Sequence, residues 1–290
     1  MAHQPVPYPA LLRRELCLRN SEYAASRKLP HALSYGDLPI VVYEPFSAGR
    51  CHGNFVDASY RAILAQPGWK RRLEKVHTQA ARSLPKRERV WRELDSSMSS
   101  DALLMNVFCY PTTLRNRNVQ SLLGIGGAAV PEFGFKARVP FLTGRTDRTE
   151  VDMKLGTLLV ESKLTETDFQ AAKADLVDSY RDLQHVFDQE ALPRIVGCYS
   201  SYQLIRNVLA AQALALDFCV LLDARRPDLR ENWFTIMSCV RDSALKTRCK
   251  VLTWQELSEA LPAELQHFLD IKYGIVPPGQ TPSAVGDLCP

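Results

Sequence analysis

Residues 149–163, TEVDMKLGTLLVESK, have the pattern of a tight β-hairpin with a glycine at its bend. Acidic and basic residues alternate with apolar ones on both sides of Gly156, which is the period of two expected of a strand. A two-residue turn at Gly156 and Thr157 pairs Leu155 with Leu158 and brings Asp152 opposite Glu161. A turn one residue earlier shifts the register by two and leaves the faces unchanged. Directly opposed side chains lie about 4.5–5.5 Å apart, so two carboxylates placed there repel each other.

The repulsion has two explanations. Two carboxylates at that separation can share a divalent cation such as Mg²⁺, which seeks oxygen ligands. Lys163 lies two residues from Glu161 on the same face, where a lysine can orient or help deprotonate an attacking water beside the metal. This set of groups suits hydrolysis of a phosphodiester. Alternatively, the polar face of the hairpin is merely solvated, and the spacing alone does not separate the two interpretations.

The chain around the hairpin predicts a mixed α/β fold. Strands are expected at residues 132–141, 194–199, 217–223 and 250–253, and helices at 167–189, 201–214, 231–240 and from 254 onward. Before the hairpin, helices are expected at 59–66, 69–82, 99–109 and 118–123, with one short strand in 38–46. We therefore expect a helical N-terminal region, residues 1–127, and an α/β core, residues 128–290, which could form a single compact unit.

Composition narrows the class of protein. The chain has 290 residues with 46% hydrophobic residues, 23% charged residues and a formal net charge of +4, which is ordinary for a globular protein. Its eight cysteines show no zinc-ligand spacing, so we expect reduced thiols. We find no signal-peptide pattern and no apolar run of the roughly 18 residues that a membrane span needs. The expected location is the cytoplasm, with no membrane partner.

The hairpin motif resembles a known superfamily. Asp152, then an apolar strand ending in Glu161, Ser162 and Lys163, resembles the PD-(D/E)xK nucleases, although Val151 stands where the name motif has proline. Further segments resemble one branch, the restriction endonucleases of the PGN_0703 type: SSDALLMNVF, EFGF, VESKLTETDF and YQLIRNVLAA. The resemblance covers residues 95–215 and implies a restriction-endonuclease-like core, a mixed β-sheet flanked by helices.

The resemblance also implies residue roles. Asp152 and Glu161 would bind Mg²⁺, for which Mn²⁺ can substitute, and the Ser162 carbonyl oxygen would complete the set. Lys163 would be the catalytic lysine. Two roles are less direct. Glu132 is our candidate for an additional acid placed before the hairpin, with Glu150 as the alternative. Gln203 is our candidate for a residue that contacts the phosphate or the lysine from a later helix, with Tyr180 and Gln184 as alternatives.

Basic residues suggest where DNA binds. Residues 70–92 hold nine Lys and Arg against two Glu, and Lys and Arg contacts to phosphate supply most non-specific affinity. The candidate DNA-binding residues are Lys70, Arg71, Arg72 and Lys75, with Arg206 from a later helix. The alternative is a solvated helix face.

We therefore interpret the chain as a Mg²⁺-dependent deoxyribonuclease that acts in restriction or repair. One alternative is a non-catalytic nucleic-acid-binding protein that retains the nuclease fold, and another is a metal-free structural α/β protein. The chain has no motor motif, so an ATP-driven partner would be a separate chain. The oligomeric state stays open, with a homodimer as one alternative.

Overall fold

The computed structural model describes residues 6–34, 38–76, 91–127 and 129–284. By their internal contacts these residues form two compact units, one of residues 1–122 together with 254–290, and one of residues 123–253. We call them the discontinuous unit and the sheet unit. The sequence placed a boundary at residue 127 and assigned all later residues to the core, whereas the segment from Trp254 onward packs with the N-terminal residues.

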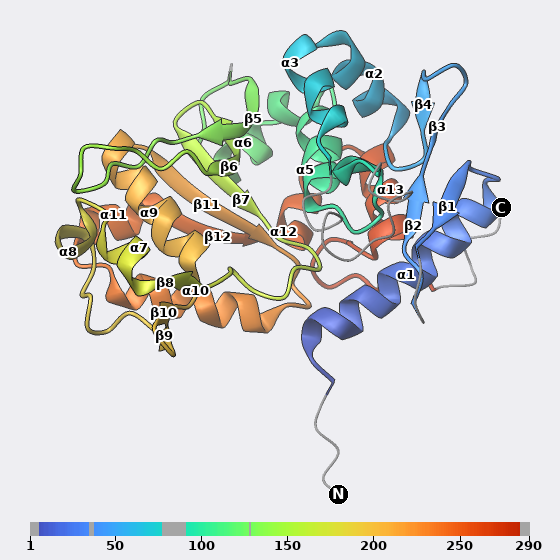
Figure 1. Ribbon diagram of the computed structural model, residues 1–290. Coiled ribbons are helices and arrows are strands. Elements are labelled where there is room, and N and C mark those ends of the chain that lie inside the picture. Colours follow the sequence, from blue (N-terminus) through green and yellow to red (C-terminus); the bar gives the residue numbers. More distant parts are fainter. Residues whose placement is uncertain (1–5, 35–37, 77–90, 128, 285–290) are drawn as a thin grey trace, which may run out of the picture. The chain divides into compact units, whose positions relative to one another are not determined.

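The sheet unit is built on a five-stranded mixed sheet (Figure 1). Its spatial order is β12 (Cys249–Thr253), β11 (Asp217–Leu222), β7 (Leu158–Ser162), β6 (Glu150–Leu155) and β5 (Pro131–Lys136). The pairs β5·β6 and β6·β7 are antiparallel, and β7·β11 and β11·β12 are parallel. The predicted class, a mixed α/β sheet flanked by helices with a helical N-terminal region, is confirmed.

The central hairpin has the predicted register. Leu155 pairs with Leu158 and Met153 with Val160, which excludes a turn one residue earlier. Gly156 occupies the bend at φ +59°, a left-handed conformation that glycine adopts without steric cost. The ladder ends at Met153 and Val160, so Asp152 and Glu161 lie just beyond its last pair.

Strand β7 is the middle strand of the sheet, and all five of its residues, which point to both faces, are buried. Leu159 lies on one face in a core shared with α9 (Tyr202–Leu214) and α10 (Pro227–Cys239). Residues alternate along a strand, so Glu161 and Lys163 share the face of Leu159. On β7, the face that carries Glu161 and Lys163 is therefore covered by protein, whereas the charged residues of β6 on that face are half-buried.

Other predicted elements are confirmed with shifted ends. The helices expected at 201–214 and 231–240 are α9 and α10, and the strands expected at 217–223 and 250–253 are β11 and β12. The chain passes from α10 to β12 through α11 (Ser243–Arg248). The strand expected at 132–141 ends at Lys136, because Arg138 adopts a left-handed φ of +53° and turns the chain out of the sheet.

The long helix expected over 167–189 is wrong. That stretch forms β8 (Ala172–Lys173), α7 (Ala174–Asp178) and α8 (Leu183–Val186). The Ser179 carbonyl accepts the Leu142 amide and the Arg181 amide donates to the Pro140 carbonyl, so backbone groups in mid-segment are used by another segment. The single strand expected at 194–199 is instead a hairpin of β9 (Arg194–Ile195) and β10 (Cys198–Tyr199), which joins β8 in a small sheet.

The discontinuous unit combines helices with short hairpins. Its N-terminal part contains α1 (Tyr8–Ser26), β1 (His31–Leu33), β2 (Val41–Tyr43), β3 (Pro45–Phe46), β4 (Cys51–His52), α2 (Asp57–Ala65), α3 (Pro67–Lys70), α5 (Ser100–Phe108) and α6 (Arg117–Leu123), with 3₁₀ turns at Arg71–Glu74, Glu93–Asp95 and Thr113–Arg115. Helix α5 begins after Ser99, whose hydroxyl caps the Ala102 amide at 3.1 Å, as predicted. The helix expected at 69–82 is limited to α3 and one 3₁₀ turn as far as residue 76, and residues 77–82 lie outside the described residues.

The C-terminal segment supplies α12 (Trp254–Ser258) and α13 (Ala263–Tyr273). Helix α13 packs on α1, where the Asn20 side chain donates to the Lys272 carbonyl at 3.2 Å. Lys272 itself is fully buried, with its ammonium 4.2 Å from the centroid of the Tyr43 ring. These contacts join residues about 250 positions apart, so local sequence patterns do not reveal them. Among the described residues, no helix combines the length and the apolar composition needed to cross a membrane.

Candidate active site

The predicted carboxylates meet at one end of the strands, where β6 begins and β7 ends. Asp152 is half-buried, and one of its carboxylate oxygens accepts the Ser162 backbone amide at 2.8 Å. On the other side of β6, the β5 register places Gly134 opposite Asp152, between the Phe133–Met153 and Phe135–Val151 pairs. Gly134 has φ +67°, a left-handed conformation that glycine adopts without steric cost, so β5 contributes no side chain opposite Asp152.

Glu161 is the most constrained carboxylate of the cluster, since the residue is only 1% exposed. Its Oε1 accepts from Lys163 Nζ at 2.9 Å, and its Oε2 accepts from Asn207 Nδ2 at 2.8 Å. A buried carboxylate is stable only when it is paired and hydrogen-bonded. These two donors satisfy that need and fix the orientation of the carboxylate.

Lys163 joins strand β7 to helix α9. Its ammonium donates to Gln203 Oε1 at 2.8 Å as well as to Glu161, and lies 5.5 Å from the centroid of the Phe169 ring. Burial alone would lower the pKa of Lys163, but the carboxylates of Glu161, Glu166 and Asp152 together raise that pKa above its ordinary value. The side chain is therefore an ammonium at neutral pH.

Helix α9 presents its polar residues with helical spacing. Gln203 and Asn207 are four residues apart and so lie on one face of the helix, toward Lys163 and Glu161. Arg206 donates to Asn207 Oδ1 at 3.0 and 3.1 Å and to the Glu150 carbonyl at 3.0 Å, which ties the helix to the start of β6. At the N-terminus of α9, the backbone amide of Gln203 donates to the Phe169 carbonyl at 3.0 Å.

A second anchor holds the same end of α9. The Tyr202 hydroxyl lies 2.9 Å from the Tyr180 hydroxyl, and both donate to Asp147 Oδ2. Burial alone would raise the pKa of Asp147, but hydrogen bonds from Thr149 and Tyr180 lower it below its ordinary value. Asp147 is thus a carboxylate directed at the two tyrosines.

The loop after Lys163 is fixed by a buried arginine. Arg226 is 0% exposed, and its guanidinium donates to the carbonyls of Leu164 at 3.3 Å, Glu166 at 2.7 Å and Thr167 at 3.1 Å. It also pairs with Asp228 at 2.8 Å, in the first turn of α10. The carboxylate of Glu166 accepts the Leu164 amide at 2.7 Å. This network sets the path of the chain directly behind Lys163.

The structure brings together four of the predicted site residues, Asp152, Glu161, Lys163 and Gln203, with Ser162 between them. Glu132 is not brought into this cluster. It lies exposed on the edge strand β5, opposite Lys154 and two positions along the ladder from Asp152. Two positions along a strand correspond to about 6.6 Å, so a direct contact requires a long side chain to reach along the sheet.

The predicted DNA-binding cations differ in their exposure and in their contacts. Lys70 and Arg71 are exposed. Arg72 and Lys75, in contrast, form ion pairs at 2.8 and 3.0 Å with Asp101, whose side chain is only 7% exposed. In the sheet unit, Arg206 is 3% exposed and its donors face Asn207 and Glu150. Three of the five cations are therefore committed to contacts inside their own units.

Three residues of the site were missed from the sequence: Asn207, Glu166 and Arg226. Asn207 had a usable signal, since it stands four residues after Gln203. Glu166 follows Glu161 by five residues and directly precedes the helix that was expected at residues 167–189. Arg226 had no signal for its role in the site, because the carbonyls that it contacts there lie 59 to 62 residues away.

The donor set fits a hard divalent cation. Asp152 and Glu161 place carboxylate oxygens on neighbouring strands, and the Ser162 carbonyl lies between Glu161 and Lys163 in the chain. Among the described residues, no group of three or more His, Cys, Asp and Glu side chains is placed to hold a metal ion. Mg²⁺ is commonly held by one or two carboxylates, with waters and substrate phosphate completing its shell. The residues present match that mode rather than a zinc site of His and Cys.

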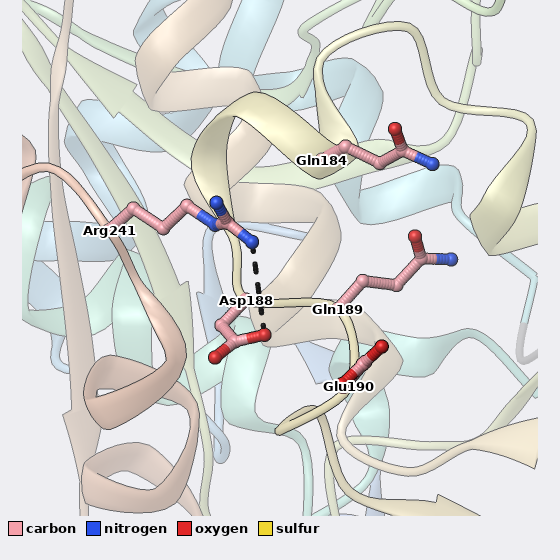
Figure 2. A pocket seen from close by; sticks show the side chains of 5 residues that line it. All are labelled: Gln184, Asp188, Gln189, Glu190 and Arg241. Carbon is pink, nitrogen blue, oxygen red and sulfur yellow. Dashed lines mark ion pairs between the residues drawn. The ribbon is translucent and has the colours of Figure 1, made fainter.

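A surface hollow of about 430 Å³ lies elsewhere in the sheet unit (Figure 2). In Figure 2, Arg241 faces Asp188 across the hollow, with 3.9 Å between the guanidinium and the carboxylate. Its lining is polar and consists of Gln184, Asp188, Gln189, Glu190 and Arg241. None of these residues belongs to the carboxylate and lysine cluster, which consists of Asp152, Glu161, Lys163 and Gln203.

Comparison with known proteins identifies a family for this chain. Searches of curated proteins and of solved structures found no match. A family model described as "Restriction Endonuclease associating with ARP" matches residues 24–274, which is most of the chain and includes the whole carboxylate and lysine cluster. The chain therefore belongs to this restriction-endonuclease-like family.

Proposed function

We propose that the chain is a metal-dependent nuclease of the PD-(D/E)xK superfamily that hydrolyses phosphodiester bonds of DNA. The family supports a nuclease-type role in DNA metabolism, and the site adds the residues for the chemistry. Restriction or repair is the expected setting. The resemblance to restriction endonucleases of the PGN_0703 type stays part of this proposal.

One observation carries the proposal: a buried ammonium shared between a carboxylate and a helix amide at the end of the central strand. Lys163 contacts Glu161 at 2.9 Å and Gln203 at 2.8 Å, and Asp152 lies on the neighbouring strand. A structural protein gains little from this arrangement, because buried ion pairs seldom add net stability over apolar packing. The cost of burying these charges is understandable when the charges serve a reaction.

The residues have distinct roles in the proposed reaction. Asp152, Glu161 and the Ser162 carbonyl would hold Mg²⁺, or Mn²⁺ in its place, with Glu132 as a further candidate acid. The bound cation would supply Lewis-acid stabilisation of the charge on the phosphoryl group. Lys163 carries its proton at Nζ and is placed to donate to a phosphoryl oxygen or an attacking water. Gln203 keeps Lys163 in place, and Asn207 keeps Glu161 in place.

Partners follow from the family and the chemistry. DNA is the proposed substrate, and the protein that the family description calls ARP is the proposed protein partner. A homodimer and a separate ATP-driven chain stay predictions from the sequence. A non-catalytic DNA-binding protein with this fold is the competing function, and it differs by binding DNA without cutting it.

The proposal is tested by incubating supercoiled plasmid with the purified chain, with Mg²⁺ or with EDTA. We expect nicked or linear product only with metal, and a rate at least about 100-fold lower for Glu161→Gln, which keeps the side-chain volume and loses the charge. Gln120→Ala, on α6 in the discontinuous unit, is a control that should leave the rate unchanged. Equal cleavage by Glu161→Gln, or cleavage in EDTA, would overturn the proposed mechanism. Binding without cleavage would favour the competing function.

A further inference from the structure

Residues 136–149, KARVPFLTGRTDRT, connect β5 to β6, and we call this segment the β5–β6 arm. It carries four cations, Lys136, Arg138, Arg145 and Arg148, and one acid, Asp147, for a net charge of +3 (four minus one). The whole chain has a net charge of only +4. The arm is therefore a local concentration of positive charge.

All four cations of the arm are exposed. Within the described residues, none of the four side chains forms an ion pair or a hydrogen bond, in contrast to Arg72 and Lys75. In the part of the chain that the structure describes, Asp147 forms no ion pair with these cations, because its carboxylate accepts from Tyr180, Tyr202 and Thr149. Its single negative charge leaves the arm with a net charge of +3. The positive charge is thus available to a ligand.

The arm is an ordered structure. The Phe141 amide donates to the Arg145 carbonyl at 2.8 Å and the Asp147 amide to the Val139 carbonyl at 2.8 Å, so the two sides of the arm are bonded to each other. The Phe141 ring stacks on Tyr180 with 4.8 Å between centroids. Ala137 and Val139 are buried in the core and alternate with the exposed Lys136 and Arg138. The arm is pre-organised, which lowers the entropy cost of binding.

The arm begins and ends at the same end of the strands as the candidate active site. Lys136 is the last residue of β5 and pairs with Glu150, the first residue of β6, two residues before Asp152. The strand β7 is antiparallel to β6, so its last residues, Glu161 and Ser162, lie at this same end. A phosphodiester backbone held by the arm would pass close to the two carboxylates.

We propose that the β5–β6 arm binds the phosphate backbone of duplex DNA and delivers a phosphodiester to Asp152 and Glu161. This inference rests on the proposed nuclease function and assigns it a substrate-binding surface. It moves the main DNA contact away from residues 70–75, where the sequence pattern had placed it. Among the cations of the arm, Arg148 and Arg145, on its return side, are nearest along the chain to Asp152.

The test measures binding of a fluorescein-labelled 30-base-pair duplex by anisotropy, in EDTA, over a range of salt concentrations. The variants are Arg145→Gln with Arg148→Gln, and separately Lys136→Gln with Arg138→Gln. Each lost phosphate contact should weaken binding on the order of tenfold at 0.1 M salt and reduce the slope of log K against log salt by about 0.9. The matched control replaces two exposed cations of the other stretch, Lys70→Gln with Arg71→Gln.

The expected result is a large loss of affinity in both arm variants and little change in the control. The inference would be overturned if the arm variants bound the duplex with the affinity and salt slope of wild type. It would also be overturned if only the control variant lost affinity, or if wild type showed no salt-dependent binding. Calorimetric titration of Mn²⁺ into the same arm variants should match wild type. If wild type binds no metal but the arm variants lose DNA affinity, the nuclease proposal fails and the arm remains the DNA-binding surface.

Discussion

Replacing Asn207 by alanine isolates the role of helix α9 in holding the candidate metal ligand. Asn207 is fully buried, and its amide donates to Glu161 Oε2 at 2.8 Å while its carbonyl oxygen accepts from Arg206. Asn207→Ala removes one of the two donors that orient Glu161 but leaves Asp152, Glu161 and Lys163 in place. The carboxylate should become less well ordered without losing its charge.

The expected magnitudes follow from the bonds that are lost. A hydrogen bond to a charged group contributes about 1.5–3 kcal/mol, and the guanidinium of Arg206 loses an acceptor as well. We expect the free energy of unfolding to fall by about 2–5 kcal/mol. Loss of a residue that orients a metal ligand typically weakens metal affinity about 10- to 100-fold, or about 1.4–2.7 kcal/mol.

The assay is calorimetric titration of Mn²⁺ into wild type and Asn207→Ala, with urea denaturation of the same samples. Asn106→Ala is the matched control, because Asn106 is equally buried and its side chain makes three hydrogen bonds in the discontinuous unit. The control should lose comparable stability and keep the Mn²⁺ affinity of wild type. Wild-type affinity in Asn207→Ala, or equal weakening in Asn106→Ala, would refute the assigned role.

Three further predictions follow from buried charges. Lys163→Met should lower plasmid cleavage at least about 100-fold. Mn²⁺ should raise the melting temperature of this variant more than that of wild type, because Glu161 has lost its neighbouring cation. An equal rise in the two proteins would contradict the prediction. Arg226→Ala should lower the free energy of unfolding by about 3–5 kcal/mol and speed amide exchange in residues 164–170, measured by mass spectrometry; unchanged exchange there would contradict the loop assignment. Burial lowers the pKa of Lys272 well below its ordinary 10.5, so the unfolded chain binds more protons and stability rises with pH below 10.5. In urea denaturation, the gain from pH 6 to pH 9 should be smaller in Lys272→Met than in wild type, and an equal gain would show that the folded lysine titrates normally.

The hairpin could be predicted from the sequence because its information is local. A period of two on each side of Gly156 determines the register and the faces, and the observed pairs match that register. The approach of Asp152 to the end of β7 follows from the same register. The motif of Asp152, Glu161 and Lys163 then supplied a chemical interpretation that the geometry of the cluster supports.

The remaining features depend on contacts between distant segments. The hairpin carries either a solvated face or a buried cluster, depending on whether α9 packs over its charged residues. Local sequence patterns do not show whether it does. The expected helix over 167–189 failed because Ser179 and Arg181 bond to the arm through their backbones. The basic stretch of residues 70–92 stays a prediction for DNA binding, since residues 77–90 lie outside the described residues. The sequence does not show that Asp101, 26 residues after Lys75, pairs with part of it. The arm was missed because its four cations are spread over 13 residues and form no run.

The measurement that tests the central claim most directly is calorimetric titration of Mg²⁺ or Mn²⁺ into wild type and Glu161→Ala, with plasmid cleavage assayed on the same samples. If Asp152 and Glu161 form the metal site of a nuclease, wild type binds the metal and cleaves DNA, and the variant does neither. Metal binding of wild-type strength in Glu161→Ala, or no metal binding by wild type even with duplex DNA present, would contradict the account.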